Sequence, residues 1–138
     1  MKIATWNVNS LNVRLPQVLD WLQHPTEALA SAPDVLVLQE TKTTDDKFPH
    51  QAFTDAGYHA QWFGQKTYNG VALLSRQPAT EVVRNIPGFD DDMARVICGG
   101  RLSGCRVMIT GMIRWLGSGY QRLRSSSISC IAANSRRV

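Results

Sequence analysis

The sequence contains no aspartate or glutamate after Asp92 and no histidine after His59. Residues 1–92 hold all eleven acidic residues against seven Lys and Arg, whereas residues 93–138 hold eight Arg and no acid. The net charge of +4 therefore combines a first part of net charge −4 with a last part of net charge +8. A basic segment of this kind attracts nucleic acids. The same segment lacks the side chains that most often act as general bases.

Long apolar runs and paired cysteines are also missing. No run of 18 apolar residues occurs, and residues 1–5 lack the apolar segment of a signal peptide, so we expect no membrane partner. The three cysteines show neither a disulfide pattern nor a metal-ligand spacing, which is typical of free thiols in a reducing compartment. We therefore expect a cytoplasmic protein. Its 138 residues, 43% of them hydrophobic, suffice for one domain with a core.

The run from Asp34 to Lys42 is the clearest local feature of the chain. Its four consecutive apolar residues, 35–38, are too few for a helix and predict a buried strand. The strand is followed by Gln39, Glu40, Thr41 and Lys42. Because ligands of open α/β sheets bind beyond the carboxyl ends of the strands, Glu40 is a candidate ligand for a hard cation. The alternative is an ordinary polar strand end that meets water.

The rest of the first part alternates between strand and helix patterns. We expect a strand over residues 2–7 that ends at Asn7, and a helix over 15–23 with Pro16 in its first turn. A short helix is expected over 49–56, and a meander of short strands on one side of the sheet over 58–63, 71–74, 80–83 and 95–98. Strand, helix and strand in succession predict a parallel or mixed α/β sheet.

Four segments in the same order, residues 2–14, 34–42, 64–76 and 91–97, resemble the motifs of the exonuclease III/AP endonuclease family. That family belongs to the endonuclease/exonuclease/phosphatase superfamily. The resemblance covers residues 1–98. It implies an α/β fold, namely the N-terminal half of a two-sheet, DNase I-like α/β sandwich, followed here by an aberrant C-terminal tail.

The resemblance also implies site residues. Asn7 and Glu40 match the metal-site positions, where amide and carboxylate oxygens suit Mg²⁺, with Mn²⁺ as the alternative. Such a metal would act as a Lewis acid on a phosphodiester. The implied partner is double-stranded DNA with abasic sites or 3′ ends, bound by a monomer. The implied DNA-binding residues are Arg14, Lys42, Tyr68, Asn69 and Arg95, and Gln39 and Lys42 would position the site.

The chain departs from the family pattern in its last part. The family's later Tyr-containing strand, Gly-Asp-x-Asn segment and Ser-Asp-His segment are absent, so no catalytic residue is assigned. Hydrolysis of a phosphodiester needs an oriented and activated water. We therefore expect a truncated product that does not cleave DNA. The activity implied for a complete relative is 3′→5′ exonuclease and abasic-site endonuclease.

Residues 99–138 form a basic, Ser/Arg-rich tail that we expect to be out of frame and poorly ordered. Residues 125–130 can be written with synonymous codons that follow an Arg124 codon ending in A. When these codons are read starting one base earlier, they encode Lys-Phe-Lys-Tyr-Lys-Leu. This resembles the family's Lys-Phe-x-Tyr-Lys-Leu run. The predicted organisation is therefore a nuclease-like part over 1–98 and an aberrant tail over 99–138.

Two other functions remain open from the sequence. The chain could be a non-catalytic DNA-binding fragment that uses its basic tail. It could also belong to a superfamily branch that acts on a phospholipid or an inositol phosphate. Residues 9–14 resemble the DNA-repair branch far more than those branches.

Overall fold

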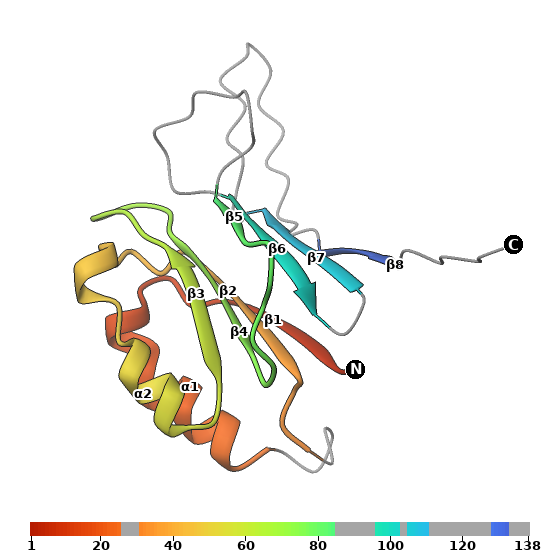
Figure 1. The fold of residues 1–138 in the computed structure, drawn as a ribbon. Coiled ribbons are helices and arrows are strands. Elements are labelled where there is room, and N and C mark those ends of the chain that lie inside the picture. Colours follow the sequence, from red (N-terminus) through yellow and green to blue (C-terminus); the bar gives the residue numbers. More distant parts are fainter. Residues whose placement is uncertain (26–30, 85–95, 103–104, 111–127, 133–138) are drawn as a thin grey trace, which may run out of the picture.

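The computed structural model describes residues 1–25, 31–84, 96–102, 105–110 and 128–132. Within them the chain forms two four-stranded sheets (Figure 1). The first sheet has the order β1-β2-β4-β3 and comprises β1 (Ile3–Asn7), β2 (Val35–Gln39), β4 (Val71–Ser75) and β3 (His59–Phe63). The second has the order β5-β6-β7-β8 and comprises β5 (Val83–Arg84), β6 (Val96–Leu102), β7 (Cys105–Thr110) and β8 (Ile128–Ala132).

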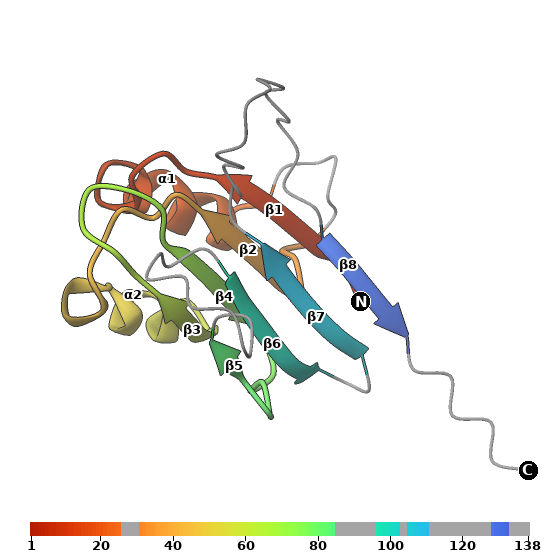
Figure 2. The same ribbon diagram turned by 90° about the horizontal axis from the view of Figure 1, so that it is seen from above.

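The layers stack in the order helices, first sheet, second sheet. Helices α1 (Leu11–Gln23) and α2 (His50–Asp55) cover one face of the first sheet, and the second sheet covers the other face (Figures 1 and 2). Strand β6 contacts β3 and β4, and β7 contacts β4, across this interface. The arrangement is a mixed α/β sandwich, as the sequence analysis expected.

The central strands β2 and β4 are buried along their whole length, because both of their faces are covered. Successive side chains of a strand point to opposite faces. Leu36 and Leu38 therefore enter the core shared with α1 and α2, while Val35 and Val37 enter the core on the other face. This double burial explains why the 35–38 run is continuously apolar rather than alternating.

Parallel pairing of β1 with β2 sets the functional end of the sheet. Ile3 lies opposite Val35, and Asn7 lies opposite Gln39, so both strands end at the same level. Strand β4 pairs antiparallel with both β2 and β3. The residues that follow Asn7 and Gln39 therefore meet at one edge of the sheet.

Several sequence-based boundaries were wrong. Helix α1 begins at Leu11 rather than at residue 15, so Pro16 lies inside the helix and not in its first turn. Leu11 starts the helix because it is fully buried and its N–H donates to the Thr41 carbonyl at 2.9 Å. The strand expected over 80–83 is the two-residue β5, Val83–Arg84. The expected single meander is divided, with β3 and β4 in the first sheet and β5 and β6 in the second.

The segment 99–138, expected to be poorly ordered, contains most of β6 and all of β7 and β8 among its described residues. Strand β7 pairs antiparallel with both of its neighbours, with an irregularity in β6 between Cys98 and Arg101. None of the helices in the described ranges is long and apolar enough to cross a membrane.

Candidate functional site

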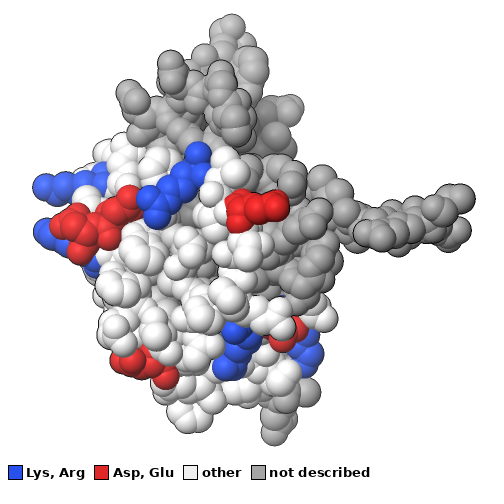
Figure 3. Space-filling model, viewed as in Figure 1, with Lys and Arg blue, Asp and Glu red and all other residues white. Residues whose placement is uncertain are grey.

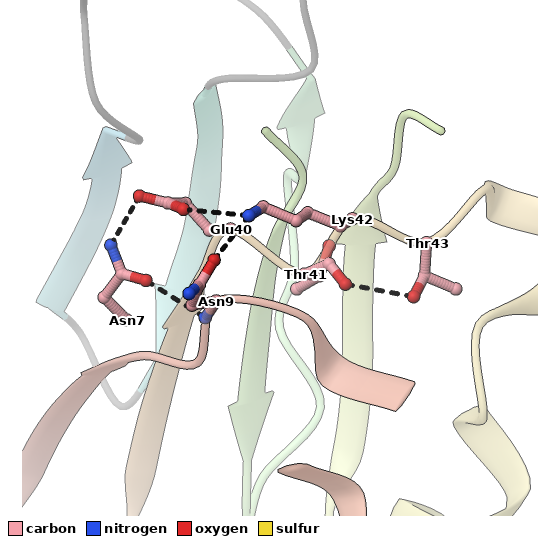
Figure 4. Close-up of polar contacts among 6 residues, drawn as sticks. All are labelled: Asn7, Asn9, Glu40, Thr41, Lys42 and Thr43. Carbon is pink, nitrogen blue, oxygen red and sulfur yellow. Dashed lines mark hydrogen bonds and ion pairs between the residues drawn. The ribbon is translucent and has the colours of Figure 1, made fainter. Parts of the chain in front are cut away.

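The ends of β1 and β2 bring the two predicted metal-site residues together. Asn7 is the last residue of β1, and Glu40 directly follows the last residue of β2. The Asn7 side-chain amide donates from Nδ2 to Glu40 Oε1 at 2.8 Å (Figure 4). The backbone continues the strand pairing, since Val8 N–H donates to the Gln39 carbonyl and Ser10 N–H donates to the Glu40 carbonyl.

Lys42 and Asn9 complete a ring of polar contacts (Figure 4). The Lys42 ammonium donates to Asn9 Oδ1 and lies 3.5 Å from Glu40 Oε2. The Asn9 backbone N–H in turn donates to Asn7 Oδ1 at 3.1 Å. Because Glu40 only accepts and a backbone N–H only donates, these two partners fix which way the Asn7 amide is turned.

The backbone of the ring is held in unusual conformations. Glu40 and Lys42 both have φ of 52°, Asn9 has φ of 44° and Ser10 has φ of 97°. Positive φ costs a residue other than glycine of order 1 kcal/mol or more, and such residues gather at functional sites. Here the backbone hydrogen bonds between the two loops offset that cost. The result is that the Glu40 and Lys42 side chains, either side of the buried Thr41, point toward the same ring.

The loop of residues 64–70, which we call the Tyr68 loop, lies beside the Glu40 segment. The Lys42 N–H donates to the Asn69 carbonyl at 2.9 Å, and the Thr41 N–H donates to the Gly70 carbonyl at 3.1 Å. The Asn69 side chain donates to Gln65 Oε1 at 3.2 Å within the loop. Tyr68 is 68% exposed, which leaves its ring free to contact a ligand.

The other predicted residues differ in their relation to the ring. Gln39 is buried; its Nε2 donates to Thr5 Oγ1 at 2.8 Å, and its Oε1 has no hydrogen-bond partner among the described residues. Arg14 is exposed in α1, one turn after Ser10, and its side chain forms no hydrogen bond or ion pair with the described residues of the ring. Arg95 lies outside the described residues. Asn9 was not predicted as a site residue, although its position two residues after Asn7 was a usable signal.

The donor set fits a hard cation that takes most of its ligands from water and substrate. Glu40 is 22% exposed and keeps acceptor capacity on both carboxylate oxygens, and Asn7 Oδ1 keeps one lone pair. Mg²⁺ is commonly held by one or two carboxylates together with substrate phosphates. Within the described ranges there is no group of three His, Cys, Asp or Glu side chains that could hold a metal by themselves.

The charges of residues 1–25 and 31–84 are balanced. Residues 1–25 and 31–84 hold seven Lys and Arg and seven Asp and Glu. On the face drawn in Figure 3, acidic and basic side chains alternate, and neither sign forms an extended patch. A long-range attraction for a polyanion therefore has to come from the arginines of residues 93–138.

Comparison with known proteins supplies an independent test. The sequence model of the endonuclease/exonuclease/phosphatase family matches residues 4–132. Exodeoxyribonuclease III of Haemophilus influenzae is 35% identical over 99 residues, which cover 70% of this chain and 34% of that protein. The DNA repair nuclease APEX1 of Danio rerio is 33% identical over 97 residues, 67% of this chain and 29% of that protein.

Solved structures give the same picture. The 3′-5′ exonuclease NExo of Neisseria meningitidis is 51% identical with a TM-score of 0.71, and the match covers 78% of this chain and 40% of that one. A Neisseria NExo variant, described as a 3′ phosphatase bound to a product DNA hairpin, matches equally well. An AP endonuclease from Archaeoglobus fulgidus is 37% identical with a TM-score of 0.70 and matching coverage of 80% and 40%. The chain thus spans less than half the length of these relatives.

Proposed function

Because the chain belongs to the endonuclease/exonuclease/phosphatase family, we propose that it carries the first part of an exonuclease III-like, metal-dependent DNA-repair nuclease. The observation that carries this proposal is the 2.8 Å contact between the side chains of Asn7 and Glu40 at the ends of adjacent parallel strands. The names of the relatives, exodeoxyribonuclease III and AP endonuclease among them, support the same reaction class.

In this proposal Glu40 is the protein's anionic ligand for Mg²⁺, or for Mn²⁺, and Asn7 positions it. When bound, the metal would supply Lewis-acid stabilisation of the departing phosphodiester oxygen. The hydrogen bond from Asn7 already fixes the Glu40 side chain in one orientation. Glu40 therefore loses little rotamer freedom when it binds a ligand. Lys42 balances the Glu40 charge until then, at 3.5 Å from Oε2.

The proposed substrate is double-stranded DNA with abasic sites or 3′ ends. The exposed Tyr68 and the neighbouring Asn69 would contact the DNA backbone beside Glu40, and Lys42 would interact with a phosphate at the ring. Arg14 and Arg95 are the further proposed phosphate contacts. Because one nuclease domain can engage one duplex, we propose a monomer. The three cysteines without a disulfide pattern support a reducing compartment, so we propose that it works in the cytoplasm.

The 138-residue chain alone should not cleave DNA. In-line attack needs a base that orients a water opposite the leaving group. Among the described histidines, His24 contacts Asp20, His50 stacks on Trp62, and His59 begins β3 level with the start of β2, at the opposite end from Glu40. No acid or histidine exists in residues 93–138 to fill the role.

The test is an abasic-site cleavage assay with Mg²⁺ on the purified chain and on Glu40→Ala. We expect no cleavage above the Glu40→Ala background. Binding of an abasic duplex, followed by fluorescence anisotropy, should remain in the wild type. Cleavage near the rate of a full-length relative, lost in Glu40→Ala, would contradict the proposed inactivity and support the nuclease assignment; absence of DNA binding would contradict the assignment itself.

A second candidate function is non-catalytic DNA binding through the basic segment. The observation that favours it is the net charge of +8 over residues 93–138, against a net charge of −4 over residues 1–92. Binding of this kind is sequence-blind and weakens steeply with salt. A titration of unrelated duplexes at several salt concentrations tests it, and a sequence-selective, salt-insensitive affinity would count against it.

We also propose that the coding frame of residues 99–138 is shifted relative to the family, although the family's sequence model aligns with the chain as far as residue 132. The support is the change of charge pattern after Asp92 together with the Lys-Phe-Lys-Tyr-Lys-Leu reading of residues 125–130. Sequencing the gene through and beyond this region is the direct test. If no alternative frame continues the family's later motifs, the frameshift is excluded.

A further inference from the structure

The Tyr68 loop starts at Gly64, where it is joined to Asp45. The Gly64 N–H donates to Asp45 Oδ1 at 2.7 Å, and the indole N–H of Trp62, two residues earlier, donates to the Asp45 carbonyl at 3.1 Å. Asp45 begins the short 3-10 turn Asp45–Lys47, which follows the Glu40 segment. One residue therefore ties the end of β3 to the chain that leaves the Glu40 ring.

Gly64 packs so closely on the backbone of residues 43–45 that no side chain fits at position 64. A Cβ added to Gly64 would lie 2.1 Å from the Thr43 carbonyl oxygen and 3.1 Å from Asp45 Oδ1. The nearer atom belongs to the backbone, so it has no flexible side chain that could move aside. The glycine thus allows the start of the loop to pack directly on the Thr43–Asp45 backbone.

The end of the loop is held in a similar way at Gly70. A Cβ there would lie 2.2 Å from Thr41 Oγ1, and Gly70 has φ of +85°. Thr41 is buried, and its N–H donates to the Gly70 carbonyl at 3.1 Å. The stretch from Thr41 to Asp45 consequently contacts both ends of the loop that carries Tyr68.

We propose that Asp45 is a positioning residue that fixes the Tyr68 loop at a set offset from Glu40, and this role rests on the proposed DNA-binding function of that loop. The hydrogen bond from the Gly64 N–H to the Asp45 carboxylate holds the first end of the loop. The last end is already held by backbone hydrogen bonds from Thr41 and Lys42. Tyr68, with Thr67 and Asn69 at φ of 75° and 55° on either side, is then presented in one conformation. A loop ordered before binding loses less entropy when it meets its ligand.

The hydrogen bond, rather than the charge, is the operative contact. The ion pair of Asp45 with Arg84 is long, at 3.9 Å, and both side chains are about half exposed, so it contributes little. An asparagine at position 45 would keep an acceptor oxygen for the Gly64 N–H, whereas an alanine would not. The two substitutions therefore separate the two roles of the side chain.

The experiment uses the full chain with Asp45→Ala, Asp45→Asn and Asp46→Ala. Asp46 is the matched control, since it is the adjacent exposed carboxylate in the same 3-10 turn. Amide hydrogen exchange at Gly64 reports the anchor, and anisotropy with a labelled duplex reports DNA affinity. Thermal unfolding of each variant verifies that it is folded.

We expect Asp45→Ala to speed exchange at Gly64 and to weaken DNA binding by about 5-fold, close to 1 kcal/mol. Asp45→Asn and Asp46→Ala should retain wild-type values in both measurements. Unchanged exchange at Gly64 in Asp45→Ala, or a loss of affinity in Asp45→Asn as large as in Asp45→Ala, would overturn the proposal.

Tyr68→Ala separates this proposal from the one on which it rests. If Tyr68→Ala leaves DNA affinity unchanged, the loop does not bind DNA and the positioning role falls with it. Faster Gly64 exchange in Asp45→Ala would then show that the anchor exists and that the proposed DNA-binding function was the failing step. If Tyr68→Ala weakens binding while Asp45→Ala does not, the loop binds DNA and the positioning role alone is overturned.

Discussion

Replacing Asn7 with aspartate tests whether the ring at the end of the first sheet is a cation site. The substitution removes the amide that donates to Glu40 Oε1 at 2.8 Å and puts a second carboxylate in its place. It also turns an acceptor of the same shape toward the Asn9 N–H, so the contact at 3.1 Å survives. The net change is a hydrogen bond converted into a like-charge contact.

The cost follows from the geometry. Two unit charges 2.8 Å apart repel by about 1.5 kcal/mol at the dielectric constant of water and by about 6 kcal/mol at an effective value of about 20. The Lys42 ammonium lies 3.5 Å from Glu40 Oε2 and offsets part of this repulsion, which favours the lower figure. Allowing the side chains to rotate apart, we expect Asn7→Asp to lower the free energy of unfolding by about 1–2 kcal/mol without Mg²⁺.

Mg²⁺ should reverse this effect, because two carboxylates bind it better than one carboxylate and an amide. The assay is thermal unfolding of the wild type and of Asn7→Asp across a Mg²⁺ titration, with calorimetry for affinity. A ligand that binds only the folded state stabilises it by RT ln(1 + [L]/Kd), so the melting temperature rises with the concentration of Mg²⁺ and rises more for the tighter site. Gln17→Glu, which adds a charge at an exposed position of α1, is the control and should show no Mg²⁺ response beyond the wild type.

An Asn7→Asp variant that melted like the wild type and gained no Mg²⁺ response would contradict this prediction. Such a result would mean that positions 7 and 40 are not in contact in solution. A wild-type protein that binds Mg²⁺ tightly and keeps that affinity in Glu40→Gln would show that the cation site lies elsewhere.

Three further predictions concern the fold. Leu38 is fully buried between the first sheet and its helices, so Leu38→Ala should cost about 2–5 kcal/mol in urea unfolding, whereas Val13→Ala, at a 59% exposed position, should be nearly neutral. Burial raises the pKa of the Tyr58 phenol, and the nearby Arg76 guanidinium offsets part of this rise, so the pKa is higher in the folded state than in the unfolded state. The neutral phenol therefore stabilises the fold fully below about pH 10, and this stabilisation is lost as the pH rises through the folded-state pKa. Tyr58→Phe should abolish that alkaline loss in pH-dependent urea unfolding and cost about 1 kcal/mol at neutral pH, because the Pro33 carbonyl loses its 2.7 Å donor. If residues 99–138 are out of frame, amide exchange should show less protection in β7 than in β2, and equal protection would count against the frameshift.

The sequence was sufficient to predict those strands and helices whose pattern of apolar residues follows directly from which of their faces are buried. The 35–38 run predicted a buried strand because a strand covered on both faces is apolar at every position. The family resemblance assigned Asn7 and Glu40 to one predicted metal site, and the parallel pairing of Asn7 with Gln39 places both residues at the same edge of the sheet. Their side-chain hydrogen bond could not be predicted, since it depends on the turn that follows each strand.

The errors have physical causes that no local pattern contains. Helix α1 begins at Leu11 because the Thr41 carbonyl, thirty residues later, accepts its N–H. Pro16 is tolerated inside the helix because it is exposed there, so water can reach the carbonyl that it leaves without a donor. The division of the short strands between two sheets depends on pairing across the sandwich, which is set by tertiary contacts.

The ring of Asn7, Asn9, Glu40 and Lys42 also bears on how metal and DNA would act together. Its one carboxylate and one ammonium cancel, so a divalent cation arriving alone meets no net negative charge and competes with Lys42 for Glu40 Oε2. A phosphate placed at the ring would offer Lys42 a new partner and the cation a second anionic ligand. Each ligand would thereby improve the site for the other, and by linkage the two gains in affinity must be equal. Weak cation binding by the free chain and stronger binding in the presence of DNA are then two consequences of one arrangement of charges.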